Sequence, residues 1–425
     1  MLYFRFTFSY KYSKLLNRIK YKEKEGTHML SKKIQAALKG SSAIRAMFVE
    51  GKELAAEIGE ENVFDFSLGN PATSAPEAVG QSIKDLVDKM DPLVLHGYMS
   101  NSGYEDVRAA VADNLNRRFG TGFTWKNIVM TVGAAGGINI VFKTILDPGD
   151  EVIVFVPYFG EYKSYAANFD ASIVEVAPDY KTFEPDLAAF EAAFSDKTKA
   201  VLVNTPNNPT GVIYSDETMR SIANIMLEKE AEYQKEIYLI SDEPYRELIY
   251  EGAKENFLTK YYHNTIVGYS FSKSLSLPGE RIGYIAVPNE VTEAEKMLAG
   301  IEVANRTLGF VNAPSLIQKA VAVCIDEKTN LEFYDKNRKA LYEGLCRLGF
   351  TCIKPQGAFY LWLKSPVEDE TEFVAEAKKY NLIMVKGSAF GCSGYVRLAY
   401  CISNEKIVRS LDAFAKLAKQ YHLGE

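Results

Sequence analysis

Residues 127–156, NIVMTVGAAGGINIVFKTILDPGDEVIVFV, contain the pattern that determines the fold class. An apolar run (128–132) predicts a strand, GAAGG (133–137) leads into a predicted helix (138–146), and a second apolar run (151–156) predicts another strand. This order predicts a βαβ unit. Free backbone N–H groups at the start of the helix would form an anion site. Because G-x-G-x-x-G is absent, a single phosphate fits better than a dinucleotide, and tight helix packing is the alternative role of these glycines.

The alternation of strands and helices continues toward the C-terminus. Further strands are predicted at 172–176, 199–204, 236–241 and 265–270, with helices at 186–194 and 216–230. We therefore predict an α/β fold with a mostly parallel central sheet flanked by helices. Four strands end in polar or kinked sequence, at 157–162, 204–211, 242–245 and 270–273. Since sites of open α/β sheets lie beyond the carboxyl ends of strands, we expect these four loops to meet at one crevice.

The stretch SFSKSLSLPGERIGY (270–284) places one lysine, four serines and one arginine directly after a predicted strand. Lys273 is the candidate centre of the site. A lysine at a sheet edge is usually a solvated surface charge, so it indicates catalysis only together with the other loops.

Composition excludes several classes of function. The chain has 425 residues, 47% of them hydrophobic and 24% charged, which suits a globular protein with two domains. A net charge of −6 and a pI of about 5.6 argue against a nucleic-acid or membrane partner. Five cysteines without C-x-x-C spacing suggest reduced thiols and a cytoplasmic location. The four histidines show no metal-ligand spacing, so no metal is predicted, and no apolar run is long enough for a membrane span.

Residues 1–28 differ from the rest, with seven Lys and Arg against two Glu. A basic arm and a disordered tail are two interpretations. We favour a third, in which this stretch is a non-native extension translated from upstream of the true start at Met29, because Lys24-Glu25-Gly26 can be encoded by a ribosome-binding sequence. Detection of peptides from 1–28 in the native protein would contradict this hypothesis. Without residues 1–28 the net charge of the chain would be −11.

Four motifs together resemble the fold-type I, class I/II pyridoxal-phosphate (PLP) aminotransferases, those similar to aspartate aminotransferase. They are NTPNNPTG (204–211), SDEPY (241–245), SFSK (270–273) followed eight residues later by Arg281, and YVRLAY (395–400). They occur in family order at matching spacings, and the resemblance runs from about Met29 to the end. It implies an N-terminal segment (29–75) packed with the small domain, a large PLP-binding domain (76–310) and a small α+β domain (311–425).

The resemblance assigns three catalytic residues. Lys273 would hold PLP as a Schiff base and, once freed by substrate, move the α-proton. Asp242 would keep the pyridine nitrogen protonated; by itself it could be a strand-end turn residue. Tyr245 would donate a hydrogen bond to the phenolic oxygen of the cofactor, together with Asn208.

The same resemblance assigns the rest of the cofactor site. Phe159 would stack on the pyridine ring, although it could equally be a core residue. Many aspartate aminotransferases have histidine where this chain has Tyr162, so a histidine behind Asp242 is not expected. The backbone N–H groups of Ala134 and Ala135 would bind the phosphate. The hydroxyls of Ser270 and Ser272 and the guanidinium of Arg281 would bind it as well. Tyr98 would reach the phosphate of a neighbouring subunit, which implies a homodimer with shared active sites.

Substrate residues follow in the same way. Arg397 would bind the α-carboxylate through a two-bond fork, with a backbone N–H from Gly69 and a contact from Asn208. Arg306 is the nearby candidate for a distal carboxylate, while Phe359 and Tyr360 could instead line a pocket for larger apolar amino acids.

The sequence of the small domain predicts helices at 301–324 and 332–348, strands within 352–363, and helices at 370–380 and 405–421. The predicted function is an aminotransferase that moves an amino group from an L-amino acid, best guess aspartate, to 2-oxoglutarate. A carbon-sulfur β-lyase, an aminotransferase for aromatic or other apolar amino acids, and a PLP-binding regulator are the alternatives.

Overall fold

The computed structural model describes residues 30–39 and 43–424 and divides into two units. The first unit, which ends at Ser41, contributes helix α2 (Lys32–Lys39). The second unit begins at Ser42 and contains everything described below. The predicted extension 1–28 lies outside the described residues.

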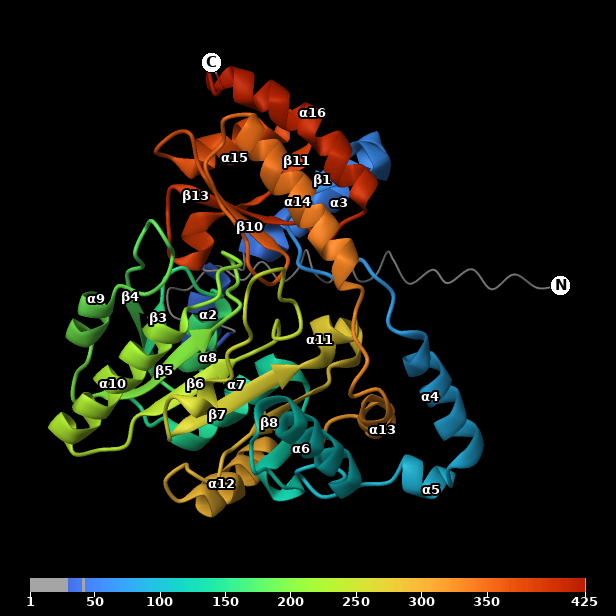
Figure 1. Cartoon of the computed structure of the whole chain (residues 1–425), viewed down its shortest axis with the longest axis vertical. Coiled ribbons are helices and arrows are strands. Elements are labelled where there is room, and N and C mark those ends of the chain that lie inside the picture. Colours follow the sequence, from blue (N-terminus) through green and yellow to red (C-terminus); the bar gives the residue numbers. More distant parts are fainter. Residues whose placement is uncertain (1–29, 40–42, 425) are drawn as a thin grey trace, which may run out of the picture. The chain divides into compact units, whose positions relative to one another are not determined.

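A seven-stranded sheet forms the centre of the second unit (Figure 1). All neighbouring strands are parallel except β8, which runs antiparallel to both of its neighbours. The mostly parallel sheet predicted from the sequence is therefore confirmed. Its strands, in spatial order, are β2 (Ile128–Thr131), β8 (Gly283–Ala286), β7 (Thr265–Ser270), β6 (Tyr238–Asp242), β5 (Thr198–Asn204), β3 (Glu151–Phe155) and β4 (Ser172–Val176).

The strands of the predicted βαβ unit, β2 and β3, belong to this sheet but are not neighbours. β2 is an edge strand, and β3 lies beside the opposite edge strand. The connecting helix α7 (Gly133–Ile145) includes the GAAGG segment, which the sequence placed before the helix. Apolar runs make the central strands buried on both faces, as the fully buried β6 and β7 show.

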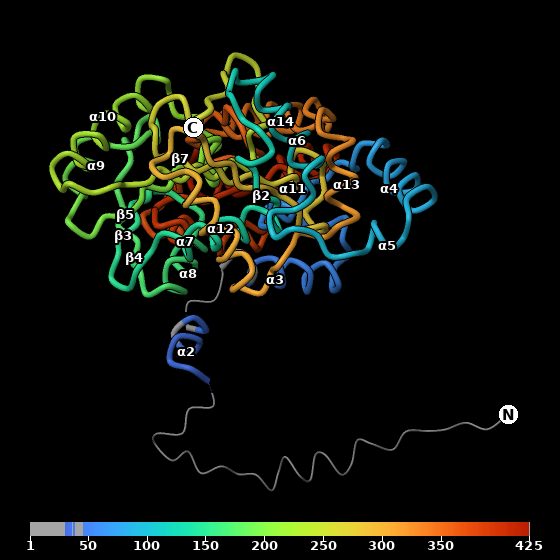
Figure 2. The backbone as a smooth tube through the Cα atoms, turned by 90° about the horizontal axis from the view of Figure 1, so that it is seen from below, coloured from blue at the N-terminus to red at the C-terminus, as the bar shows by residue number. Residues whose placement is uncertain are grey.

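Helices cover both faces of the sheet. Figure 2 shows α7, α8 and α12 on one side, and α6 and α10 on the other. The helices of this part are α4 (Glu77–Lys89), α5 (Pro92–Leu95), α6 (Glu105–Phe119), α8 (Glu161–Ala167), α9 (Leu187–Ala192), α10 (Asp216–Tyr233), α11 (Phe271–Ser274), α12 (Ala294–Thr307) and α13 (Ser315–Val323). The 3₁₀ turns are η2 (Trp125–Asn127), η3 (Leu258–Lys260) and η4 (Pro278–Glu280).

The C-terminal part has its own sheet and core, at the top of Figure 1. Four antiparallel strands lie in the order β12 (Val385–Lys386), β13 (Tyr395–Ala399), β10 (Tyr360–Lys364) and β9 (Cys352–Ile353). The N-terminal strand β1 (Phe64–Asp65) pairs in parallel with β11 (Leu382–Ile383), so the segment after α3 packs against C-terminal elements. The helical elements here are α3 (Ala43–Ile58), η1 (Glu60–Asn62), α14 (Leu331–Arg347), α15 (Glu370–Lys378), η5 (Gly387–Phe390) and α16 (Asn404–Gln420).

One predicted helix is wrong. The sequence predicted a single helix over 301–324, but the structure has α12 and α13 with a break between them. Gly309 adopts a positive φ of 83°, and Pro314 lacks the N–H that a continuing helix would need. In the described part of the chain, no helix combines the length and apolarity needed to cross a membrane.

Candidate active site

A cavity of about 250 Å³ lies at the carboxyl ends of β5, β6 and β7. The start of α7 and the strands β10 and β13 contribute further walls. Of the residues predicted for the site, all but Tyr98, Arg306 and the alternative pocket residue Phe359 line it. The lining residues are Leu68, Gly69, Ala134, Ala135, Ile138, Phe159, Tyr162, Tyr165, Asn204, Asn208, Asp242, Pro244, Tyr245, Ser270, Ser272, Lys273, Pro278, Arg281, Tyr360 and Arg397.

Lys273 projects into this cavity from α11, the short helix that follows β7. Its Nζ donates a 2.6 Å hydrogen bond to the carbonyl oxygen of Gly69 and lies 5.3 Å from the ring centroid of Phe359. Burial lowers the pKa of Lys273 to about 8, with Arg397 and Arg281 acting in the same direction. A large fraction of the amine is therefore neutral near pH 8, the form that can act as nucleophile or base.

Asp242 ends the buried strand β6 and is 5% exposed. Its Oδ2 accepts a 2.5 Å hydrogen bond from the Tyr162 hydroxyl, whereas its buried Oδ1 has no partner. Burial raises the pKa of this carboxyl to about 7. A buried acceptor without a partner is costly, so the geometry suits a ligand that brings a cationic N–H donor to Oδ1.

Two asparagines, at the end of β5 and in the loop that follows it, form hydrogen bonds with other residues of the site. The Nδ2 of Asn204 donates to the carbonyl oxygen of Asp242 at 2.9 Å, and its Oδ1 accepts from the backbone N–H of Asn208 at 2.8 Å. The Oδ1 of Asn208 accepts from Nη1 of Arg397 at 3.1 Å. Asn204 was not among the site residues predicted from the sequence, although its position at the carboxyl end of β5 indicates a place beside the site.

The Tyr245 hydroxyl lies 2.8 Å from the Tyr360 hydroxyl, and both side chains are buried. Burial raises the pKa of Tyr245 well above its ordinary value, so this phenol stays protonated and can donate. Tyr360 also explains Gly69, because a Cβ at position 69 would lie 2.0 Å from the Tyr360 hydroxyl oxygen. Only glycine allows the chain to pass so close.

The opposite end of the cavity is rich in donors. Ala134 and Ala135 occupy the first turn of α7, where backbone N–H groups have no partner within the helix. The Ser270 hydroxyl donates to Ser272 Oγ at 2.8 Å. Arg281 holds a positive φ of 52°, and a Cβ on Gly133 would lie 3.1 Å from its Nη2. A helix start, two hydroxyls and a guanidinium form a set that can bind a dianionic phosphate.

Arg397 enters from β13 and is 1% exposed. Its Nη2 donates to the Ser67 carbonyl, and its guanidinium lies 4.5 Å from the ring centroid of Tyr360. Its Nε is buried without a partner, and burial lowers the pKa of the group. Among the described residues no carboxylate forms an ion pair with Arg397, so this buried guanidinium with an unused donor is suited to bind a carboxylate from a ligand.

Two predicted residues lie outside the cavity of this chain. Tyr98 follows α5 and is 97% exposed. Arg306 is exposed near the end of α12. Phe159, by contrast, lines the cavity beside Tyr162, with its ring centroid 5.6 Å from that of the tyrosine.

Comparison with known proteins identifies this arrangement. The family model described as "Aminotransferase class I and II" matches residues 61–414. The chain belongs to the class I and II aminotransferases. It is therefore a transaminase of the PLP-dependent fold type I.

Relatives of this aminotransferase cover nearly its whole length. The aspartate/prephenate aminotransferase of Thermus thermophilus is 30% identical, over 91% of this chain and 98% of the relative. The probable aspartate/prephenate aminotransferase of Thermus aquaticus is 34% identical over 75% of this chain and 83% of its own length. A crystal structure of an aminotransferase from Eubacterium rectale is 44% identical, with a TM-score of 0.90 over 93% of this chain and all of that one.

The cavity of this aminotransferase fits PLP on its own geometry. Lys273 supplies an amine, the unpartnered Oδ1 of Asp242 can accept from a pyridine N–H, and the start of α7 with Arg281 can hold a phosphate. Each feature would be hard to explain in a purely structural cavity, since buried polar atoms normally find partners within the protein.

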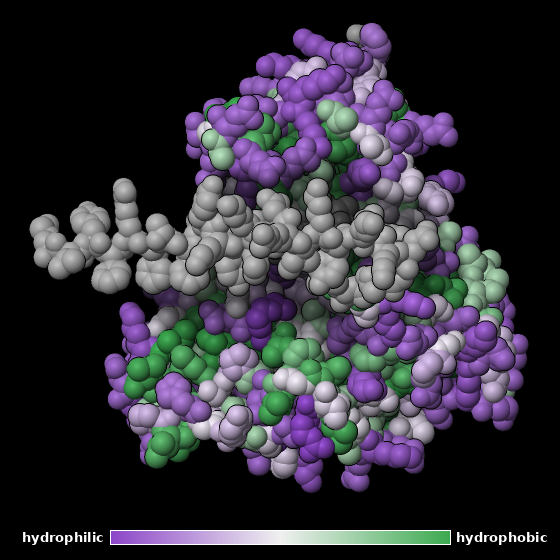
Figure 3. Space-filling view, turned by 180° about the vertical axis from the view of Figure 1, so that it is seen from behind, coloured by the Kyte–Doolittle hydropathy of each residue, from purple (hydrophilic) through white to green (hydrophobic). Residues whose placement is uncertain are grey.

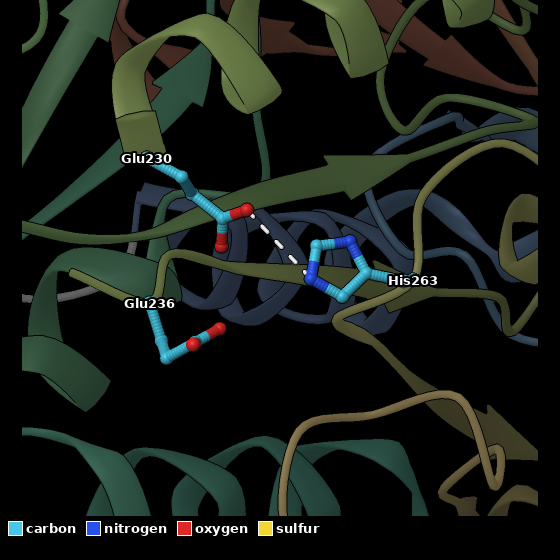
Figure 4. Close-up of side chains that lie close together, drawn as sticks. All are labelled: Glu230, Glu236 and His263. Atoms are coloured by element: carbon cyan, nitrogen blue, oxygen red, sulfur yellow. Dashed lines mark ion pairs between the residues drawn. The ribbon is translucent and has the colours of Figure 1, made fainter. Parts of the chain in front are cut away.

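A second cluster lies at the amino ends of the strands, where Figure 4 shows Glu230, Glu236 and His263 pointing toward one another. Their candidate ligand atoms lie within 4.8 Å, a grouping that histidine spacing in the sequence did not reveal. His263 Nε2 is 3.7 Å from a Glu230 carboxylate oxygen. Both carboxylates already accept protein hydrogen bonds, including one each from the side-chain amide of Asn264.

Proposed function

We propose that this aminotransferase moves the amino group of L-aspartate to 2-oxoglutarate. One observation carries the proposal: a single cavity brings together the Lys273 amine, the unpartnered carboxylate oxygen of Asp242 and the buried guanidinium of Arg397. The two Thermus relatives, both aspartate/prephenate aminotransferases by name, support aspartate as the donor.

Each residue has a task that follows from its contacts. Bound PLP supplies an electron sink for the α-carbon of the amino acid. Asp242 would hold a proton at the pyridine nitrogen of bound PLP, and Tyr162 fixes the orientation of this carboxylate. Arg397 orients the amino acid by its α-carboxylate, so the α-proton faces the Lys273 amine, which removes it and later returns it. Tyr245 would donate a hydrogen bond to the phenolic oxygen of PLP, and Asn208 positions Arg397.

The distal carboxylate needs a further cation. The cations that line the cavity are Lys273, Arg281 and Arg397, and each already has a role. We therefore assign Arg306 of a second subunit to the distal carboxylate and Tyr98 of that subunit to the phosphate, which makes the active protein a homodimer. Arg306→Ala should raise the KM for aspartate and leave that for alanine unchanged.

The surface around Tyr98 supports an interface. Leu93 is 85% exposed, Val94 56% and Val87 54%, and all three are apolar residues of α4 and α5. Figure 3, seen from behind, shows apolar surface at the lower left, the side on which these helices lie. Burial of such side chains stabilises association. We place the dimer in the cytoplasm, where its five free cysteines stay reduced.

The deciding experiment is the visible absorption spectrum of the PLP-loaded protein before and after aspartate alone, with Lys273→Ala as the control. We expect the cofactor band to shift to shorter wavelength in the wild type and not in the variant. A shift only with another amino acid would replace aspartate as donor. Release of pyruvate and thiol from cystathionine without an oxo acid would instead indicate a β-lyase.

A further inference from the structure

A hydrogen bond between two phenols links the cofactor side of the cavity to its substrate side. The hydroxyls of Tyr245 and Tyr360 lie 2.8 Å apart, and the two residues are 5% and 3% exposed. Tyr360 lines the cavity as the first residue of β10, and its ring centroid lies 4.5 Å from the guanidinium of Arg397. Tyr360 therefore contacts one residue on each side of the cavity.

Backbone hydrogen bonds hold the two tyrosines at this distance. The N–H of Leu248 donates to the carbonyl of Tyr245 at 2.8 Å, and the carbonyl of Leu248 accepts from the N–H of Ala358 at 2.8 Å. The turn after Tyr245 is thus tied to the segment that leads into Tyr360. The two rings meet nearly edge to face, with centroids 5.6 Å apart and an interplanar angle of 81°. The contact between the two hydroxyls is therefore fixed by the fold.

The direction of this hydrogen bond decides what Tyr245 offers to a ligand, because each phenol has a single proton. If Tyr360 donates, the proton of Tyr245 stays free to point into the cavity. The positive charge of Arg397 beside the Tyr360 ring favours this direction, since a nearby cation makes a phenol a stronger acid and a better donor. Burial raises the pKa of Tyr245 well above its ordinary value, and it raises the pKa of Tyr360 to about 12 against the effect of Arg397.

We propose that Tyr360 is a positioning residue that donates to the Tyr245 hydroxyl and directs the proton of Tyr245 toward the phenolic oxygen of PLP. A hydrogen bond received by a hydroxyl polarises it and strengthens its own donation. The stronger donor stabilises negative charge on the phenolic oxygen, which favours loss of the proton from the Lys273 nitrogen that holds the cofactor. This inference rests on the role proposed for Tyr245 and is independent of the choice of aspartate as amino donor.

The test is a pH titration of the visible cofactor band of the PLP-loaded, full-length protein without any amino acid. Tyr360→Phe keeps the ring beside Arg397 and removes only the hydroxyl. We expect its titration midpoint to rise by about 0.5–1 pH unit, the effect of one hydrogen bond. Tyr250→Phe is the matched control, because it removes a buried hydroxyl that bonds to Ala358 and Tyr400 outside the cavity, and its midpoint should equal that of wild type. An unchanged or lower midpoint in Tyr360→Phe, or an equal rise in both variants, would overturn the proposal.

A double-mutant cycle tests whether Tyr360 acts through Tyr245. Tyr245→Phe alone should raise the midpoint by more than Tyr360→Phe does, because it removes the direct donor. Adding Tyr360→Phe to Tyr245→Phe should give no further rise, whereas additive rises would contradict an action through Tyr245. An unmoved midpoint in Tyr245→Phe would remove the proposed role of Tyr245 and this inference with it. A rise in Tyr245→Phe without a rise in Tyr360→Phe would overturn this inference alone.

Discussion

The two ends of β6 and β7 both carry clustered carboxylates, yet the two clusters differ in what their oxygens contact. At the carboxyl ends, Asp242 is buried and one of its oxygens has no partner. At the amino ends, the carboxylates of Glu230 and Glu236 accept hydrogen bonds from Ile237, Asn264 and Thr292. At the carboxyl ends, a ligand can supply the hydrogen-bond donor that Asp242 lacks. At the amino ends, the protein itself supplies the donors for Glu230 and Glu236.

This difference separates a binding site from a structural network better than residue type does. Carboxylates lie at both ends, but the catalytic cavity is the one lined by side chains with unpartnered buried atoms, Oδ1 of Asp242 and Nε of Arg397. A buried polar group without a hydrogen-bond partner destabilises the folded protein. Such a group is therefore expected where a bound ligand supplies the partner.

Matched carboxylate-to-amide changes at the two ends of β6 should give the largest contrast. Asp242→Asn should lower kcat/KM about 10²–10³-fold, because the charge that holds the pyridine proton is lost. Glu236→Gln should leave kcat/KM unchanged. Steady-state kinetics with aspartate and 2-oxoglutarate measure both. Equal losses in the two variants would remove the distinction between the ends.

Arg397→Lys should have the next largest effect. Lysine keeps the charge but cannot form the two-bond fork, and the loss of a charge-assisted hydrogen bond of ~1.5–3 kcal/mol predicts a KM for aspartate about 10–100-fold higher. Arg220→Lys, on the exposed face of α10, is the matched control and should behave as wild type. If KM stays constant in Arg397→Lys, the α-carboxylate binds elsewhere.

Tyr162→Phe should reduce kcat by about tenfold, the value of one hydrogen bond of ~1.5 kcal/mol to a charged group. This hydrogen bond lowers the pKa of Asp242 against the effect of burial, so its removal should raise that pKa further. The acidic limb of the pH profile of kcat/KM should move to higher pH. Tyr158→Phe, which removes a buried hydroxyl bonded to Glu175 outside the cavity, serves as control, and an unmoved profile in Tyr162→Phe would assign Tyr162 to packing alone.

Lys273→Met should change the stability of the cofactor-free protein in a pH-dependent way. Burial lowers the folded-state pKa of Lys273 to about 8, below its ordinary 10.5, so the charged amine destabilises the fold at neutral pH. Between pH 8 and 10.5 the unfolded chain binds more protons, and wild-type stability recovers. Lys273→Met should therefore melt a few degrees higher at pH 7, with the gain shrinking toward pH 10. A gain independent of pH would contradict this origin.

The sequence predicted the parallel sheet because apolar runs followed by polar turns are local patterns. The motifs around Asn208, Asp242, Lys273 and Arg397 also predicted residues that line the cavity, since the carboxyl ends of parallel strands lie at the same edge of a sheet. The break between α12 and α13 was missed, because apolar periodicity on both sides concealed Gly309 and Pro314.

What the sequence determined by itself is which residues sit at strand ends and which chemistry they offer. Only the tertiary structure decided that Tyr360 meets Tyr245 and that one oxygen of Asp242 lacks a partner. The physical reason is that periodicity and turn chemistry act between near neighbours in the chain. Whether a buried polar atom has a hydrogen-bond partner depends instead on every segment that packs around it.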